Sequence, residues 1–269
     1  MPYVLRQLCW PADILSKFTG ELVRWRENVL YMVGYLGNFP VPALLQHLRF
    51  DHAFNQVIVP GELPATLTKL TFGARFNHPI GERVLPPLLT HLSFGSDFNQ
   101  PLGECVLPEG LTHLAFGSVR GVTLSFDSAF NHPISEHVLP PDLTQLALGP
   151  AFNHQIGERV LPPCLTQLRF GHAFNHFDAD VLPTSLTELE LGHNFNQQIH
   201  AEALPPSLKR LTLPRWMMCC SPLEWQDELA DSGITLAYRN CAHCPSPNTF
   251  CSRGTLKCPG LDCYACRRA

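Results

Sequence analysis

The sequence predicts a repeat solenoid: a curved, parallel β-sheet of about eight short strands, with a helical N-terminal cap and a Cys-rich C-terminal segment. Two recurring signals predict this class. A Phe-Asn pair returns every 21 or 22 residues, with one interval of 32, and a Leu-Pro pair precedes each Leu-Thr-x-Leu core. A unit this short cannot bury its own apolar residues, so successive units must stack on one another.

The 269 residues divide into four segments. Residues 1–40 are expected to cap the solenoid, 41–214 to form its repeats, 215–240 to close it with a helix and a strand, and 241–269 to form a Cys-rich tail. In the first segment, apolar residues at steps of three and four from Ile14 to Val33 predict a helix. Such a cap would cover the first coil, which would otherwise expose apolar surface.

Each repeat is expected to contain a strand, a turn and a return path. The alternation Leu-x-Leu-x-Phe predicts a strand with one buried face. Gly73 and its counterparts follow the strand, where the chain must turn. Prolines before the next strand stiffen the return path. In the second coil Phe76, Ile80 and Val84 are expected to fill the core.

Two polar positions follow the phenylalanine of each pair. The first is asparagine, which we expect to bond to backbone groups left unpaired by the turn and to form a ladder along the solenoid. The ladder would contain Asn55, Asn77, Asn99, Asn131, Asn153, Asn175 and Asn196. The second position is histidine in four coils. Because glutamine, a poor metal ligand, replaces it in three others, we interpret this column as hydrogen bonding rather than metal binding.

The repeat resembles the FNIP family, a branch of the leucine-rich repeats known from amoebae and from the large viruses that infect them. The stretches that carry the resemblance are FNHPI at 76–80, FNQPL at 98–102 and FNHPI at 130–134, with the Leu-Pro and Leu-Thr-x-Leu-x-Phe elements around them. It covers residues 41–214 and implies a leucine-rich-repeat-like solenoid used as an interaction surface, with no enzymatic activity of the repeat itself. One departure is the 32-residue interval; another is a coil shortened by one residue at His176-Phe177-Asp178.

The outward residues of the strands are the candidate site. In each Leu-Thr-x-Leu-x-Phe strand the third and fifth residues should face solvent on the concave side, and we call this surface the strand face. These residues vary in charge and size while the leucines barely change, which fits either a solvated surface or a partner-binding one. Candidates for partner binding are His47, Arg49, Lys69, Thr71, His91, Ser93, His113, Gln145, Gln167, Arg169, Glu188, Glu190 and Arg210. Ala115, Ala147 and Thr212 complete the two rows.

Ten extra residues between Phe116 and Phe130 account for the 32-residue interval. The halves LAFGS and LSFDS echo each other across Val119-Arg120-Gly121, so a short projecting hairpin or an abortive extra strand would fit. Insertions in repeat proteins often lie on the binding face, but here a neutral insertion is favoured.

The first segment also allows a second interpretation. Residues 10–15, WPADIL, look like the L-P-x-[DE]-I-L opening of an F-box, and Val23-Arg24-Trp25-Arg26 resembles its later V-x-x-W element. Some FNIP proteins carry an F-box ahead of the repeats, so the resemblance implies a substrate-recruiting adaptor of a ubiquitin ligase. Because the two elements lie too close together for a full-length F-box and Trp10 replaces the usual leucine, the cap is favoured.

After the repeats, Ser221-Pro222-Leu223-Glu224 forms a capping box that predicts a helix to about Asp231, followed by a strand over 233–238. In the tail, Cys241-x2-Cys244 and Cys263-x2-Cys266 are separated by 18 residues, a spacing that suits one structural zinc ion. Cys251, Cys258 and His243 leave the ligand set ambiguous, and a disulfide-linked or unstructured tail is the alternative.

Composition narrows the class of function. A formal net charge of −4 argues against a nucleic-acid binder, and the sequence contains no apolar run of 18 residues to span a membrane. The N-terminus has no signal-peptide pattern, so we expect a cytoplasmic protein. Since no motif arranges a nucleophile, a base and an orienting acid, the expected function is a non-enzymatic scaffold for an unidentified protein partner, with no cofactor in the repeats.

Overall fold

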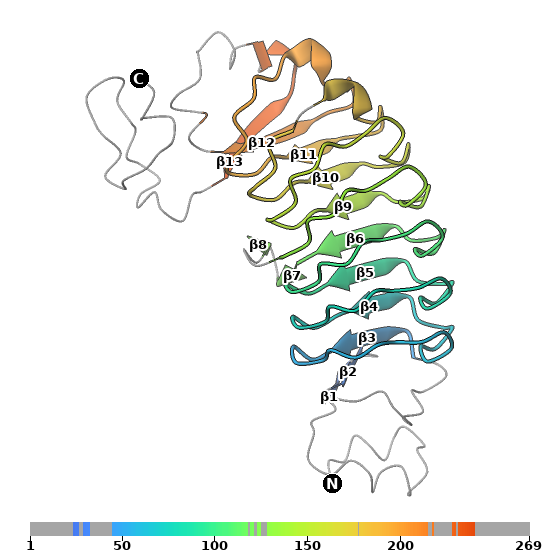
Figure 1. Cartoon of the computed structure of the whole chain (residues 1–269). Coiled ribbons are helices and arrows are strands. Elements are labelled where there is room, and N and C mark those ends of the chain that lie inside the picture. The colour runs from blue at the N-terminus through green and yellow to red at the C-terminus, as the bar shows by residue number, and fades with distance from the viewer. Residues whose placement is uncertain are drawn as a thin grey trace, which may run out of the picture.

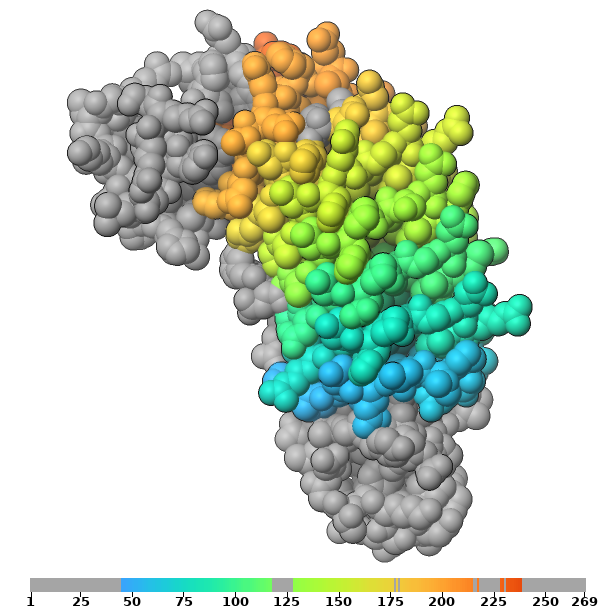
Figure 2. All heavy atoms as spheres, in the orientation of Figure 1, coloured from blue at the N-terminus to red at the C-terminus, as the bar shows by residue number. Residues whose placement is uncertain are grey.

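The computed structural model describes residues 24–26, 29–32, 45–117, 119–120, 123–124, 128–176, 178–214, 217, 228–229 and 231–239. Figure 1 shows the coils stacked along an arc, each coil contributing one strand to a shared sheet. In Figure 2, where all heavy atoms are drawn as spheres, successive coils lie against one another, so the described repeats form one continuous body. The predicted class, a curved parallel solenoid, is confirmed.

The repeat strands lie where the Leu-x-Leu pattern predicts them. They are β3 (His47–Phe50), β4 (Lys69–Thr71), β5 (His91–Phe94), β6 (His113–Phe116), β9 (Gln145–Ala147), β10 (Gln167–Arg169), β11 (Glu188–Glu190) and β12 (Arg210–Pro214). Consecutive strands of this series pair in parallel and in register, leucine beside leucine. Register holds because a one-residue slip would turn every buried leucine towards solvent.

Three more strands extend the sheet at its two edges. β1 (Arg24–Arg26) pairs antiparallel with β2 (Val29–Met32), and β2 pairs in parallel with β3. The helix predicted for the N-terminal cap is therefore wrong for these residues; the rest of 1–40 lies outside the described residues. The sequence VLYM consists of residues that favour strands, and as a strand it satisfies the backbone groups that the edge of β3 would leave unpaired.

The opposite edge ends in β13 (Thr235–Arg239), which pairs in parallel with β12, as the sequence predicts. Glu228, Leu229 and Asp231 have helical backbone, and Gly233 follows with φ +80°. The predicted start of this helix, at Ser221, lies outside the described residues.

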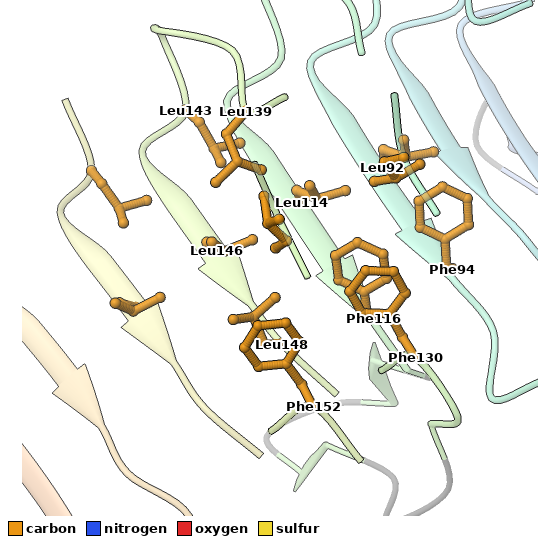
Figure 3. Close-up of a cluster of buried hydrophobic side chains, with 14 of the residues drawn as sticks. Leu92, Phe94, Leu114, Phe116, Phe130, Leu139, Leu143, Leu146, Leu148 and Phe152 are labelled. Carbon is orange, nitrogen blue, oxygen red and sulfur yellow. The ribbon is translucent and has the colours of Figure 1, made fainter. Parts of the chain in front are cut away.

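Leucine and phenylalanine side chains fill the interior of every coil. Phe76, Ile80 and Val84 are at most 5% exposed, as predicted for the core. The phenylalanines stack continuously: within a coil, ring centroids such as those of Phe94 and Phe98 lie 3.9 Å apart, and Phe98 and Phe76 of adjacent coils are 6.0 Å apart. Figure 3 shows this packing around Phe116 and Phe130, where the leucines of neighbouring strands point into the same interior.

Adjacent coils lie in close contact at the glycine that follows most of the repeat strands. A Cβ on Gly73 would overlap the carbonyl oxygen of Asp51 in the preceding coil, and one on Gly95 would overlap that of Gly73. Neither glycine has a left-handed φ. At these two positions glycine is therefore required by the contact between coils, and not by the sharp turn for which the sequence appeared to need it; Gly117, ahead of the insertion, differs in having φ +105°.

The insertion forms a small hairpin. β7 (Val119–Arg120) pairs antiparallel with β8 (Thr123–Leu124), apart from the main sheet and beside the carboxyl end of β6. The backbone amide of Asn131 still bonds to Asn99 at 3.0 Å across the 32-residue interval. The insertion therefore leaves the coil register intact.

The last two complete coils carry short 3-10 helices in their return paths, η2 (Ala179–Val181) and η3 (Ala201–Ala203). η2 lies in the coil that lacks one residue, where Val181 and Leu182 pack partly buried against the core. Across the described residues, the structure contains no helix with the length and apolar character needed to cross a membrane.

Candidate functional site

The strand face consists of two straight rows of side chains. Along β3, β5 and β6 the residues alternate between partly exposed and buried, so the third and fifth positions point away from the core. Cross-strand register aligns all the candidate residues. The first row is His47, Lys69, His91, His113, Gln145, Gln167, Glu188 and Arg210, and the second is Arg49, Thr71, Ser93, Ala115, Ala147, Arg169, Glu190 and Thr212.

Charge is distributed unevenly along these rows. Strands β3 to β6 carry Arg49, Lys69 and three histidines and contain no acidic residue. Strands β9 to β12 carry two arginines together with Glu188 and Glu190. The Arg169 guanidinium lies 3.6 Å from the Glu190 carboxylate, so at least one of these acids is paired within the face.

His91 and His113 form a stacked pair in the middle of the first row. Their ring centroids are 4.0 Å apart, with 11° between the ring planes. The Oγ1 of Thr90 lies 2.9 Å from Nδ1 of His91 and donates its own proton to the carbonyl of Thr68. Nδ1 must therefore be the protonated nitrogen, which donates to Thr90 and leaves Nε2 as an acceptor. Thr112 holds His113 in the same way.

This environment disfavours the charged imidazole. Partial burial, followed by the nearby His113, Lys69 and His47, lowers the pKa of His91 to about 4. Burial and then Lys69 also lower the pKa values of His113 and His47. All three therefore favour their neutral form at neutral pH.

The asparagines form a second, exposed row along the edge of the coils. From Asn55 to Asn175, the Oδ1 of each accepts a hydrogen bond from the backbone amide of the next asparagine at 2.9–3.0 Å. His78, His132 and His154 bond through Nε2 to the asparagine carbonyl of the preceding coil at 3.1–3.3 Å. Gln100 and Gln197 bond to the same carbonyl position. Histidine and glutamine therefore make the same hydrogen bond at this position, which is consistent with the interpretation from the sequence.

The threonine of the Leu-Thr-x-Leu core has a function that the sequence reasoning missed. In five consecutive coils its Oγ1 donates to the backbone carbonyl of the preceding coil's threonine at 3.0 Å. The signal was its recurrence at 68, 90, 112, 144, 166 and 187 beside a leucine. Because Thr90 and Thr112 also hydrogen-bond to the stacked histidines, this ladder helps to orient side chains of the strand face.

No group of three or more His, Cys, Asp or Glu side chains within the described residues is arranged to hold a metal ion. The predicted zinc ligands Cys241, Cys244, Cys263 and Cys266 lie outside the described residues.

Comparison with known proteins identifies the repeats. The model of the FNIP repeat matches residues 76–119, 130–173, 152–193 and 174–215, with its break at the hairpin insertion. The chain is an FNIP repeat protein. A solved structure described as "CroV588 a novel circular LRR protein structure" is similar to it, with 46% sequence identity over 64% of the chain and a TM-score of 0.51. This FNIP protein spans 27% of that longer chain. A search of curated proteins found no match.

The F-box interpretation of the N-terminus gains no support from these results. Trp25 and Arg26, taken from its second element, lie in β1, whose pairing with β2 continues the sheet of the FNIP repeats. Its first element, residues 10–15, lies outside the described residues.

Proposed function

We propose that this FNIP repeat protein is a non-enzymatic scaffold that binds a partner protein through the strand face, on the concave side of the solenoid. The observation that carries the proposal is the contrast between the two sides of each strand. The inward leucines are almost identical and nearly fully buried, whereas the outward rows differ from coil to coil in charge and size. A rigid sheet with a varied surface supports recognition of another protein, because little ordering is needed on binding.

Charge reversal on the strand face tests the proposal. We expect that replacing Arg49, Lys69 and Arg169 with glutamate lowers partner capture in affinity purification from the native cell several-fold, because these charges contribute to complementarity with the partner. Circular dichroism of the variant should match that of the wild type, since all three side chains are at the surface.

A matched control carries the same change in net charge elsewhere. Arg75, Arg83 and Arg159 are exposed arginines outside the two rows, and their replacement with glutamate should leave capture unchanged. Equal loss in both triple variants would attribute capture to net charge alone. Unchanged capture by the strand-face variant would move the site to the insertion or elsewhere.

A further inference from the structure

The middle of the strand face carries hydrogen-bonding side chains that have no charge at neutral pH. On β5, β6, β9 and β10 the first row consists of His91, His113, Gln145 and Gln167, which we call the neutral row. In the same row Lys69 precedes this stretch on β4, and Glu188 and Arg210 follow it on β11 and β12. Within the first row, charged side chains therefore flank the neutral row and do not enter it.

Each histidine of the neutral row presents one hydrogen-bond acceptor. Thr90 and Thr112 donate their own protons to backbone carbonyls, so they accept from Nδ1 of His91 and His113. Nε2 is then the unprotonated nitrogen of each ring. The pKa values of both histidines are lowered, chiefly by burial, so both rings favour the neutral form at pH 7.

The two glutamines of the neutral row present a carbonyl oxygen and an amide NH2, so each can both accept and donate. Within the described part of the chain, the Nε2 atoms of His91 and His113 and the side-chain amides of Gln145 and Gln167 make no hydrogen bond. All four side chains are partly exposed. The neutral row therefore offers acceptors on β5 and β6, and both acceptors and donors on β9 and β10, to a bound molecule.

The second row is small beside the neutral row. Ser93, Ala115 and Ala147 lie in register on β5, β6 and β9, and all three are partly exposed. The next residue of this row, Arg169, lies 3.6 Å from Glu190 and ends the stretch of small side chains. A polypeptide backbone can therefore approach the sheet closely over β5, β6 and β9 and bring its amide and carbonyl groups beside the neutral row.

An extended polypeptide has the groups that complement the neutral row, because its backbone carries an amide donor and a carbonyl acceptor at each residue. Neighbouring strands are about 4.8 Å apart, so the four strands span roughly 14 Å, the length of about four or five extended residues. A charged segment would find no opposite charge in the neutral row, so an uncharged one is the better electrostatic match. The threonine ladder orients both histidines before binding, which lowers the entropic cost of forming these bonds.

We propose that the neutral row and the small second row beside it bind an extended, uncharged segment of the partner protein through its backbone. Amides of the segment donate to Nε2 of the two histidines, and the side-chain amides of the two glutamines donate to its carbonyl oxygens. The backbone of the segment lies over the small second row. This inference rests on the proposed function and adds the part of the strand face that is used and the chemistry of the partner.

Binding of short peptides to the full chain, measured by fluorescence anisotropy, tests the recognised chemistry. The probe is a ten-residue, fluorescein-labelled peptide of alternating serine and alanine, for which we expect saturable binding. The same peptide with N-methyl groups on its alanines should bind at least about tenfold more weakly, because half of its amide donors are removed. Peptides of alternating serine and glutamate, or serine and lysine, should each bind at least about threefold more weakly.

The second row is tested with residue types that the chain itself contains in this row. We expect Ala115→Arg with Ala147→Arg to raise the dissociation constant at least about tenfold, because the long side chains block the approach of the backbone. Arg169 shows that the fold accommodates arginine at this position. The control, Ala115→Ser with Ala147→Ser, introduces the residue type of Ser93 and should leave the dissociation constant within about threefold.

The histidines are tested in the same way. His91→Lys with His113→Lys removes both Nε2 acceptors and should raise the dissociation constant at least about tenfold, whereas Lys69 shows that the fold accommodates lysine in this row. His91→Gln with His113→Gln introduces the residue type of Gln145, keeps an acceptor on each strand and should stay within about threefold. Circular dichroism verifies the folding of every variant.

Several results would overturn the proposal. These are no saturable binding of the uncharged peptide, equal binding of its N-methylated form, tighter binding of either charged peptide, or equal effects of the arginine and serine pairs or of the lysine and glutamine pairs. Capture from the native cell separates this proposal from the proposed function. If Ala115→Arg with Ala147→Arg leaves capture intact while the triple replacement of Arg49, Lys69 and Arg169 abolishes it, the scaffold function survives and the uncharged-segment proposal fails. If neither variant affects capture, both fail.

Discussion

At the scale of single residues, one position in the return path adopts a left-handed backbone in successive coils. It holds Gly61 with φ +88° in the first described repeat and then Arg83, Cys105, His137 and Arg159 with φ between 58° and 63°. Side chains other than glycine reach this region at a cost of about 1–2 kcal/mol. In the later coils this conformational cost is tolerated because the coils on both sides hold the turn in place.

Substituting two glycines of similar exposure separates backbone conformation from packing. We expect Gly61→Ala to lower the free energy of unfolding by about 1 kcal/mol, because its φ of +88° is unfavourable for alanine while no atom lies within 4 Å of the new Cβ. Gly81→Ala is the control: it has no left-handed φ, and its Cβ would make an ordinary 3.9 Å contact with Val84. Urea denaturation measures both, and equal destabilisation would rule out a conformational cause.

At the scale of elements, the hairpin β7–β8 interrupts a coil without changing it. Phe116 and Phe130, on either side of the insertion, stack at 3.9 Å, the same distance as Phe94 and Phe98 in an uninterrupted coil. Gly117, with φ +105°, precedes the hairpin, and the buried Ser128 follows it. The insertion is therefore confined to the junction between a strand and the turn that follows it, and the packing on either side is unchanged.

Excising residues 118–127 should leave a folded solenoid. The joined sequence FGSAFN matches FGSDFN of the preceding coil, and the interval returns from 32 to 22 residues. We expect the free energy of unfolding to change by no more than about 1 kcal/mol, since closing a loop of this length costs little. Thermal denaturation and partner capture are the measurements. Loss of capture with intact folding would place binding on the hairpin, against the strand-face proposal.

At the scale of the whole molecule, the sheet is a linear series. Its order follows the chain from β1 to β13, apart from the separate hairpin, and each repeat strand pairs with its immediate neighbours. The stability of such an array is approximately a sum of coil and interface contributions. A destabilising substitution in one coil should therefore lower the stability of that coil and its immediate neighbours more than that of distant coils.

Replacing a stacked phenylalanine in two distant coils tests this locality. Phe98→Ala and Phe195→Ala both remove fully buried rings and should each cost about 3–5 kcal/mol where the cavity forms. Hydrogen exchange should accelerate most in β5 and β6 for Phe98→Ala, and in β11 and β12 for Phe195→Ala. A uniform acceleration over all strands in either variant would show instead that the solenoid unfolds as a single cooperative unit.

Much of the candidate site could be predicted from the sequence, because Leu-Thr-x-Leu-x-Phe fixes which residues face outward. The two rows from His47 to Arg210 and from Arg49 to Thr212 follow from that alternation and a constant period. The stacking of His91 on His113, the ion pair of Arg169 with Glu190 and the threonine ladder could not be predicted in this way. Each is a contact between residues of adjacent coils, and its geometry depends on the distance between those coils.

The sequence by itself determined the period, the repeat strands, their buried side and the final edge strand. It could do so because stacked units require the same residue types at the same positions, and that requirement is visible in one dimension. Only the tertiary structure decided that VLYM joins the sheet, that Gly73 is needed where two coils touch, and that His91 favours its neutral form. These outcomes depend on what the neighbouring coil places against each residue, and a repeat pattern does not contain that information.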